Sequence, residues 1–157
     1  MALSQYRDAV MGKVILPNDL MLGEVSQLLH EGREVVMTTK GNSMRPFIRG
    51  EVDNVRLQRP KELKVGDIVL ARFEGRYILH RIIGIKGEQV TMMGDGNLQG
   101  VEQVLKSDVS GVVVEIITPE GKRRKPYKGR IWNFLLPFRK YLLKIYRKWN
   151  RLRGKQI

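Results

Sequence analysis

Between residues 34 and 118 the sequence alternates short β-prone runs with turn signals, and this alternation constrains the fold more than any other feature. The turn signals are KVGD, EGR, KGE and GDGN. The predicted strands are, in order, EVVMTT, VDNVRL, DIVLARF, RYILHRIIGI, EQVTMMG and VSGVVVEIIT. Short strands at this spacing predict a mainly β fold, a compact and coiled antiparallel sheet that resembles a barrel. FEGRYILH predicts a tight hairpin that places His80 on its return strand.

One helix is predicted before the sheet and one after it. Asn18 or Asp19 can cap a short helix whose apolar residues follow helical spacing and which ends near Gly32. His30 ends this helix, and we interpret it as a structural or surface residue because cations favour helix C-termini. The C-terminal helix is amphipathic and basic, and Pro137 marks its first turn or a kink.

The charge is divided unequally along the chain. Residues 1–120 hold 15 Lys and Arg and 16 Asp and Glu, whereas residues 121–157 hold 14 Lys and Arg and no acidic residue. A near-neutral body therefore carries a strongly basic tail. The predicted divisions are an N-terminal arm (1–17), a β domain (18–118), a basic linker (119–130) and the amphipathic basic helix (131–157).

The residue types that the chain lacks restrict its chemistry. It has no cysteine, which excludes disulfides, thiolate chemistry and a Cys-ligated metal site. Its two histidines are few for a metalloenzyme. We therefore expect no metal ion and no cofactor. No stretch has the length and apolar character of a membrane span or a secretory signal. The expected location is the cytoplasm, either free or peripheral on the membrane.

Three side chains of the β region are candidates for a serine-type catalytic site. A serine hydroxyl needs a positioned base, and the base works best when an acid orients it. Ser43 lies in GNSMRP, between Gly41 and Pro46, which bracket a turn. His80 lies among apolar residues, and Asp95 lies between two glycines. Spacing alone does not distinguish this triad from a turn serine, a strand histidine and a turn aspartate.

Six motifs in the same order resemble those of the signal peptidase I family, and they cover roughly residues 36–117. GNSMRP resembles the G-x-S-M-x-P box, and RGEVDNV resembles the G-D-x-V segment with Glu51 in place of the commoner Asp. The other four motifs are KVGDIVLARF, LHRIIGI, MMGDGN and DVSGVVVEI. Bacterial signal peptidases and self-cleaving SOS repressors carry lysine where this chain has His80. The histidine resembles the archaeal and endoplasmic-reticulum subtype.

The resemblance implies a serine endopeptidase with the signal-peptidase and SOS-repressor peptidase fold. Ser43 would be the nucleophile, His80 the general base and Asp95 the orienting acid. The oxyanion donor and the cleft floor would come from the turn around the serine, which includes Gly41, Met44 and Pro46. Arg81 is interpreted as a member of an ion pair or a strand-edge charge. The expected substrates are leader or precursor peptides, bound as extended segments with small side chains beside the serine.

Two departures from the family pattern limit the resemblance. The sequence shows no N-terminal transmembrane helix, and Glu102 is the only acid shortly after the GDGN turn, where His-type members carry a further Asp. The alternative function is a non-catalytic β-fold binding module that uses the basic tail on a membrane or nucleic acid. A self-cleaving repressor is disfavoured because the chain lacks a helix-turn-helix domain and an Ala-Gly or Cys-Gly cleavage linker.

The tail helix has aromatic and leucine residues on one side and basic residues on the other. This pattern favours an anionic membrane surface as the partner. A nucleic acid fits less well because the aromatic residues align with the leucines and do not interleave with the charges. Packing of the apolar side on the body or on a partner protein is the third interpretation. The residues assigned to membrane or partner binding are Trp132, Phe138, Leu142, Lys144, Ile145, Arg147, Lys148 and Trp149.

Overall fold

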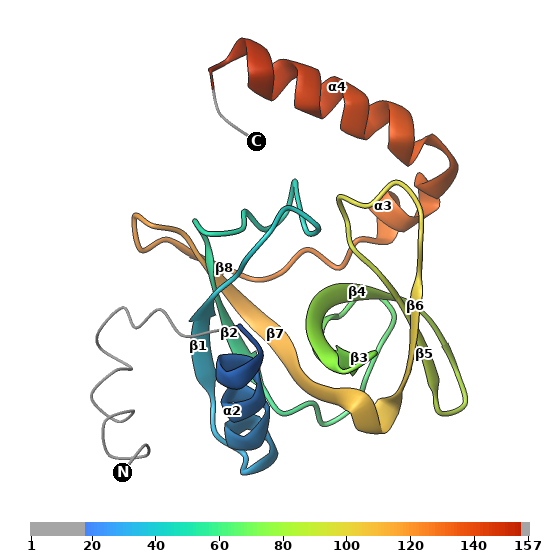
Figure 1. The fold of residues 1–157 in the computed structure, drawn as a ribbon. Helices are drawn as coiled ribbons and strands as arrows, with labels where there is room; N and C mark the ends of the chain where they lie inside the picture. The colour runs from blue at the N-terminus through green and yellow to red at the C-terminus, as the bar shows by residue number, and fades with distance from the viewer. Residues whose placement is uncertain (1–17, 155–157) are drawn as a thin grey trace.

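The computed structural model describes residues 18–154, and the N-terminal arm predicted at 1–17 lies outside the described residues (Figure 1). The described chain is mainly β. A curled, half-barrel sheet of eight strands is flanked by α2 (Asn18–His30) at one side and by C-terminal helices at another. Helix α2 covers the residues expected for the first helix, and it ends two residues before Gly32. The predicted fold class is confirmed.

The sheet is antiparallel at every pairing of the described strands, in the order β1-β2-β7-β3-β4-β5-β6, with β8 paired to β7. The strands are β1 (Val35–Thr38), β2 (Asn54–Gln58), β3 (Ile68–Phe73), β4 (Arg76–Lys86), β5 (Gln89–Met93), β6 (Glu102–Leu105), β7 (Val109–Ile117) and β8 (Arg123–Arg124). A 3-10 turn, η1 (Lys106–Asp108), joins β6 to β7.

All six strands predicted from the sequence are present, as β1 to β5 and β7. The expected hairpin joins β3 to β4, where Phe73 pairs with Arg76 across Glu74 and Gly75. Both turn residues have positive φ, the backbone conformation that matches the twist of a two-residue hairpin. Strands β6 and β8 were not predicted, because β6 buries only Val104 and β8 has two residues.

The core consists of two apolar clusters. In the first, Leu22, Val25 and Leu29 of α2 pack against buried residues of the sheet and of the loop after β1. The second lies within the curl of β3, β4, β5 and β7 and includes Val69, Ile82 and Met92. Burial on both faces explains why strands such as β3 read as continuous apolar runs.

The segment expected as a linker, residues 119–130, is packed on the body. It turns back after β7 and pairs as β8, with Ile116 opposite Arg124. Further along, Lys128 Nζ lies 2.6 Å from the Asp67 carboxylate. A Cβ added to Gly66 would lie 2.3 Å from the Lys128 backbone oxygen, so glycine at this position permits the close contact.

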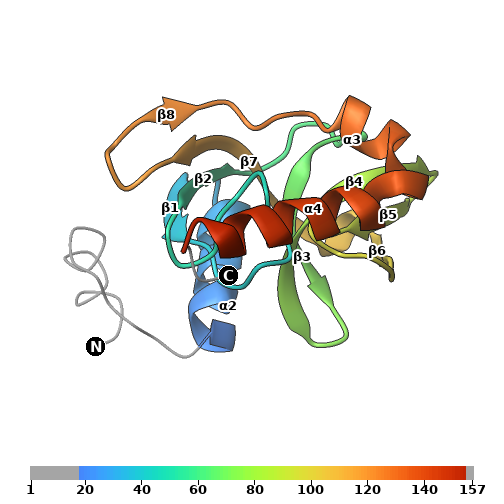
Figure 2. The same cartoon turned by 90° about the horizontal axis from the view of Figure 1, so that it is seen from above.

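The C-terminal segment forms three consecutive elements where one helix was expected. They are α3 (Arg130–Phe134), the 3-10 turn η2 (Leu136–Phe138) and α4 (Arg139–Leu152). Pro137 lies within η2, which fits the expected kink. Figure 2 shows α4 crossing the molecule from the β5–β6 side toward β1 and β2. Within residues 18–154, no helix combines the length and the apolar character that crossing a bilayer requires.

Candidate active site

The loop that carries Ser43 joins β1 to β2 and is closed at its base by backbone hydrogen bonds. Glu51 N donates to Thr39 O over 2.6 Å, and Thr39 N donates to Asp53 O over 3.3 Å. A Cβ on Gly50 would lie 1.8 Å from Gly41 O, so the two arms of the loop meet only because residue 50 is glycine. The local sequence therefore builds a pinched loop with Ser43 near its tip.

An ion pair braces the same loop. Arg49 donates its backbone N–H, Nε–H and Nη2–H to the Asp53 carboxylate, over 2.8, 3.2 and 2.7 Å. Burial raises the pKa of Asp53, but the hydrogen bonds and charge of Arg49 outweigh that effect and hold the pKa below its ordinary value. The loop is thus held by a carboxylate that stays ionised.

The GDG turn between β5 and β6 packs directly against the backbone of the serine loop. Gly96 N donates to Ser43 O over 2.7 Å. A Cβ on Gly94 would lie 2.5 Å from Ser43 O, and one on Gly96 would lie 2.7 Å from Asn42 O. The two glycines therefore allow one backbone to approach the other, and this contact positions Ser43.

His80 lies on β4 and contacts a carboxylate that the resemblance did not assign. His80 Nδ1 is 2.8 Å from Glu102 Oε2, and the two side chains are 9% and 15% exposed. Ile82, Met92 and Glu102 stand opposite one another across β4, β5 and β6. His80 precedes Ile82 by two residues, so its side chain leaves the same face of the sheet as that of Glu102. Glu102 is therefore the acid that orients His80.

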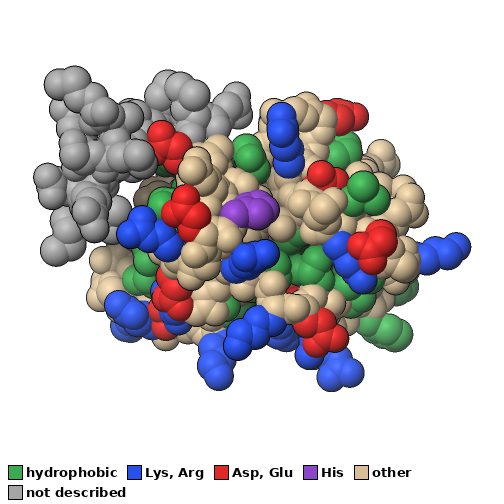
Figure 3. All heavy atoms as spheres, turned by 90° about the horizontal axis from the view of Figure 1, so that it is seen from below, with side chains coloured by type: hydrophobic (Ala, Val, Ile, Leu, Met, Phe, Trp, Pro, Cys, Tyr) green, Lys and Arg blue, Asp and Glu red, His purple; other side chains and the backbone are tan. Residues whose placement is uncertain are grey.

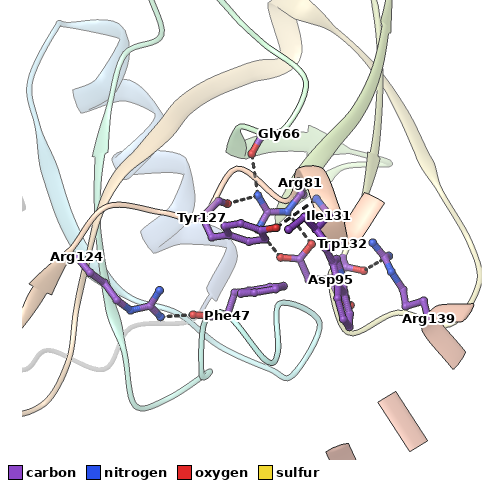
Figure 4. Close-up of polar contacts among 10 residues, drawn as sticks. Phe47, Gly66, Arg81, Asp95, Arg124, Tyr127, Ile131, Trp132 and Arg139 are labelled. Atoms are coloured by element: carbon purple, nitrogen blue, oxygen red, sulfur yellow. Dashed lines mark hydrogen bonds and ion pairs between the residues drawn. The ribbon is translucent and has the colours of Figure 1, made fainter. Parts of the chain in front are cut away.

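Asp95 does not contact His80, and its predicted role as the orienting acid is wrong. Its two carboxylate oxygens each accept a hydrogen bond from Arg81, from Nε and Nη2, over 2.7 Å (Figure 4). Both side chains are fully buried. Arg81 follows His80 directly in β4, and successive side chains of a strand point to opposite faces. Asp95 thus lies on the face away from the imidazole, and the interpretation of Arg81 as an ion-pair partner is confirmed.

The C-terminal segment completes the surroundings of this buried pair. Arg81 Nη1 donates to Gly66 O over 2.8 Å and also to Tyr127 O, and its guanidinium lies 5.6 Å from the centre of the Phe47 ring. The Trp132 ring meets Phe47 edge-on at 5.4 Å between centroids. The buried pair is therefore covered by residues that the sequence predicts to lie in a linker and a tail.

Three side chains of the C-terminal segment bind the carbonyl oxygens of the GDG turn. Trp132 Nε1 donates to Asp95 O over 3.1 Å, Arg139 Nη1 donates to Gly94 O over 3.3 Å, and Arg147 Nη2 donates to Gly96 O over 3.4 Å. Burial lowers the pKa of Arg139 from its ordinary value, with the charge of Asp95 opposing the shift. The C-terminal helices thus hold the turn that supports Ser43.

Ser43 and His80 line the same pocket, which has a volume of about 210 Å³. Its other walls come from α2, the end of β1 and the first half of β4, and apolar side chains predominate. Of the predicted cleft residues, Gly41 and Met44 line the pocket and Pro46 does not. Among residues 18–154, neither the hydroxyl nor the backbone N–H of Ser43 has a hydrogen-bond partner, so both remain available to a bound molecule.

The arrangement provides the groups that a serine nucleophile needs. An ionised Glu102 can only accept a hydrogen bond, so the neutral form of His80 has its proton on Nδ1 and its lone pair on Nε2. Such an imidazole can accept a proton from a serine hydroxyl in the same pocket. The sequence signal for Glu102 was its place as the first acid after the GDGN turn, where His-type members of the family that the motifs resemble carry a further Asp.

The predicted tail residues differ in their contacts and exposure. Trp132 and Arg147 donate hydrogen bonds to the GDG turn, so both also have a contact inside the fold. Leu142 is half-buried. The exposed residues among them are Phe138, Lys144, Ile145, Arg147, Lys148 and Trp149. The interpretation that the apolar side packs on the protein's own body is wrong for these exposed positions.

Comparison of the chain with models of known families gives no match, and comparison with curated proteins gives none either. The functional inference therefore depends on the six motifs and on the geometry of the pocket.

Proposed function

We propose that this protein is a serine endopeptidase that cleaves leader or precursor peptides. Ser43 is the nucleophile, His80 is the general base, and Glu102 is the residue that positions His80. The observation that supports this best is the 2.8 Å contact between His80 Nδ1 and Glu102 Oε2 beside a pocket that Ser43 also lines. A base oriented by a carboxylate shares this pocket with a serine whose hydroxyl has no hydrogen-bond partner among residues 18–154. Acyl transfer by a serine nucleophile uses these groups.

The reaction follows from these groups. His80 Nε2 takes the hydroxyl proton as Ser43 Oγ attacks the carbonyl carbon of the scissile peptide bond. The backbone N–H of Ser43, which has no partner within the described part of the chain, stabilises the resulting oxyanion. His80 then gives the proton to the departing amine as the C–N bond breaks, which leaves an ester on Ser43. A water molecule, deprotonated by His80, attacks the ester and releases the carboxylic acid product.

The free edge of β1 suggests how a substrate binds. Strand β1 ends the sheet, and its outer edge has no strand partner within the described part of the chain. The residues from Met37 to Gly41 run from β1 along the pocket wall toward Ser43. An extended peptide that adds to this edge by main-chain hydrogen bonds would enter the pocket. The apolar lining, which includes Leu22 and Met44, suits a small or apolar side chain beside the scissile bond.

The experiment is cleavage of a diverse peptide library by the purified full chain, read by mass spectrometry. We expect discrete cleavage sites with small or apolar residues before the cut, and loss of all cleavage in Ser43→Ala. A hydroxylamine-sensitive increase in intact mass at Ser43 would identify the acyl-enzyme. Cleavage that survives Ser43→Ala refutes the assignment. A folded protein that cleaves nothing would favour the alternative of a non-catalytic binding module.

Glu102→Gln tests the role of the carboxylate. Glutamine can still hold the ring in place. Its amide N–H can donate to His80 Nδ1, which stabilises the tautomer with the proton on Nε2, and that tautomer cannot accept the serine proton. The kcat should therefore fall by about 10²- to 10⁴-fold. KM should change little, because Glu102 does not line the pocket. The matched control is Glu88→Gln, whose side chain is 79% exposed and should leave kcat unchanged. Equal kcat in the two variants would contradict the role of Glu102.

A further inference from the structure

Helix α4 presents different faces to the body and to solvent. Its buried residues are Arg139, Leu143 and Asn150, which are spaced by four and seven residues and form the face toward the body. Ile145 follows Leu143 by two residues, a rotation of about 200° on an α-helix. Ile145 therefore lies almost opposite the buried face. The helix is held on the body by one side only.

The opposite side carries a continuous row of exposed apolar residues, which we call the apolar stripe. Its first member, Phe134, ends α3. From Phe138, which precedes α4, the later members follow at spacings of three or four residues, so they share one face of α4. The exposed fractions of all members run from 53% to 84%. The members of the stripe are Phe134, Phe138, Tyr141, Ile145, Trp149 and Leu152. An exposed apolar row of this length marks an interaction surface.

Cations flank the stripe and no acidic residue accompanies them. Lys140, Lys144, Lys148 and Arg151 are exposed on α4, and residues 121–157 contain neither Asp nor Glu. The face of the molecule turned away from α4 differs, since basic and acidic side chains are intermingled there (Figure 3). The positive field is thus concentrated around the apolar stripe. An anionic surface complements this distribution of charge.

We propose that α4 and η2 bind the surface of an anionic lipid bilayer, with the apolar stripe inserted at the level of the headgroups and the flanking cations on the lipid phosphates. The helix crosses one outer side of the body, as Figure 2 shows, so its apolar side can lie parallel to a bilayer plane. An amphipathic helix with aromatic and aliphatic residues on one side and lysines beside them has the features of an interfacial helix.

Charge and aromatic placement favour a bilayer over the other partners. A second copy of the chain would place Lys144 and Lys148 near the same cations of its partner, so like charges oppose dimerisation through the stripe. A nucleic acid stacks on aromatic rings that alternate with cations, whereas Phe138 and Trp149 share their face with Ile145. An apolar protein partner would leave the surrounding cations without a counter-charge.

The bilayer contact and the proposed active site share one structural support. Arg139 and Arg147 extend from α4 to the carbonyl oxygens of Gly94 and Gly96, and Gly96 N binds Ser43 O. A bilayer-bound α4 therefore holds the serine loop in a defined orientation relative to the membrane. The binding itself does not depend on catalysis, and it is tested without an activity readout.

The test is co-sedimentation of the full chain with vesicles of phosphatidylcholine containing about one third phosphatidylglycerol. Phe138→Ser with Ile145→Ser removes apolar area from the stripe, and Lys144→Gln with Lys148→Gln removes charge beside it. Each double variant should bind at least about tenfold more weakly than the unmodified chain. Vesicles of phosphatidylcholine alone should bind about tenfold more weakly as well.

Control substitutions lie at exposed positions outside α4. Val65→Ser with Val101→Ser removes apolar side chains of similar exposure, and Lys61→Gln with Lys86→Gln removes exposed charge. Both controls should bind the anionic vesicles like the unmodified chain. Circular dichroism and the melting temperature confirm that each variant is folded. Equal loss of binding in controls and stripe variants would overturn the proposal, because it would show non-specific adhesion.

Fluorescence gives a second readout of insertion. In Trp132→Phe the remaining tryptophan is Trp149, which is 53% exposed. Anionic vesicles should shift its emission to the blue, and lipids brominated near the headgroup end of the acyl chain should quench it. An unchanged spectrum with bound vesicles would overturn the insertion. Concentration-dependent dimerisation that the stripe variants abolish, or tight nucleic-acid binding without vesicle binding, would assign the stripe to those partners instead.

Discussion

Replacement of Asp95 by Asn should destabilise the fold strongly, although it changes one oxygen to nitrogen. Arg81 and Asp95 are both fully buried, and the carboxylate accepts two 2.7 Å hydrogen bonds from the guanidinium. Asparagine has nearly the same shape but no charge. The substitution therefore leaves the positive charge of Arg81 in the interior without its counter-charge.

The expected loss follows from the contacts that survive. Removal of one partner from a buried ion pair costs about 3–5 kcal/mol. Arg81 keeps two backbone acceptors, Gly66 O and Tyr127 O, and the side-chain carbonyl of the introduced asparagine can still accept one hydrogen bond. We therefore expect the lower end of the range, about 3 kcal/mol. For a chain of this length, each kcal/mol shifts the melting temperature by about 2–4 °C, so Asp95→Asn should melt roughly 6–12 °C lower.

The assay is urea unfolding followed by circular dichroism, together with a thermal melt. The control is Glu62→Gln, which breaks an ion pair with Lys64 whose side chains are 73% and 68% exposed. An exposed pair contributes little, and we expect a change within about 0.5 kcal/mol. The contrast separates burial of the charge from the loss of any carboxylate.

The outcome also checks that Asp95 neutralises Arg81 and does not orient His80. If it orients His80, Asp95→Asn should abolish peptide cleavage and leave the unfolding free energy nearly unchanged. If it neutralises Arg81, the unfolding free energy should fall by the amount derived above. Unchanged stability would refute the reasoning from the buried pair.

Two further substitutions probe the serine loop. Gly94→Ala should displace Ser43, since its Cβ would lie 2.5 Å from Ser43 O, and should cost about 1–3 kcal/mol in urea unfolding together with most of the cleavage activity. Gly84→Ala is its control, because that Cβ would meet only ordinary contacts at 3.8 Å, and equal losses in the two variants would contradict the steric argument. The lowered pKa of Asp53 predicts that its stabilising contribution is complete above its unfolded-state pKa, near 3.8, and is lost as the pH falls through the lower folded-state pKa. The unfolding free energies of the unmodified chain and Asp53→Asn should therefore converge on acidification from pH about 5, and Arg49→Met should weaken this pH dependence, whereas a constant difference would contradict the ion pair.

The strand and turn order could be predicted from the sequence because each signal is local. Alternating or continuous apolar runs, bounded by turns such as EGR and KGE, mark β3, β4 and β5 from neighbouring residues alone. Strand β6 was not predicted, because four residues with one buried side chain give too little periodicity. The packing of residues 119–130 on the body was not predicted, because it depends on contacts with Gly66 and Asp67, which lie far away in the chain.

The candidate site was predicted in part. The motifs predicted Ser43 and His80 as site residues, and these two residues line one pocket. The sequence predicted Asp95, and not Glu102, as the acid beside His80, because chain order does not determine which acid contacts the imidazole. Alternation along β4 separates His80 from Arg81 by face, and the curl of β5 and β6 then brings a different acid to each.

The sequence by itself determined the first helix, six of the strands and the charge of the tail, since these are properties of residues close together in the chain. Only the tertiary structure decided that Glu102 meets His80, that Asp95 neutralises Arg81, and that Trp132 belongs to the body. It also decided which side of α4 faces solvent. The physical reason is that partner choice depends on strand register and sheet curvature, which the whole packed chain sets together.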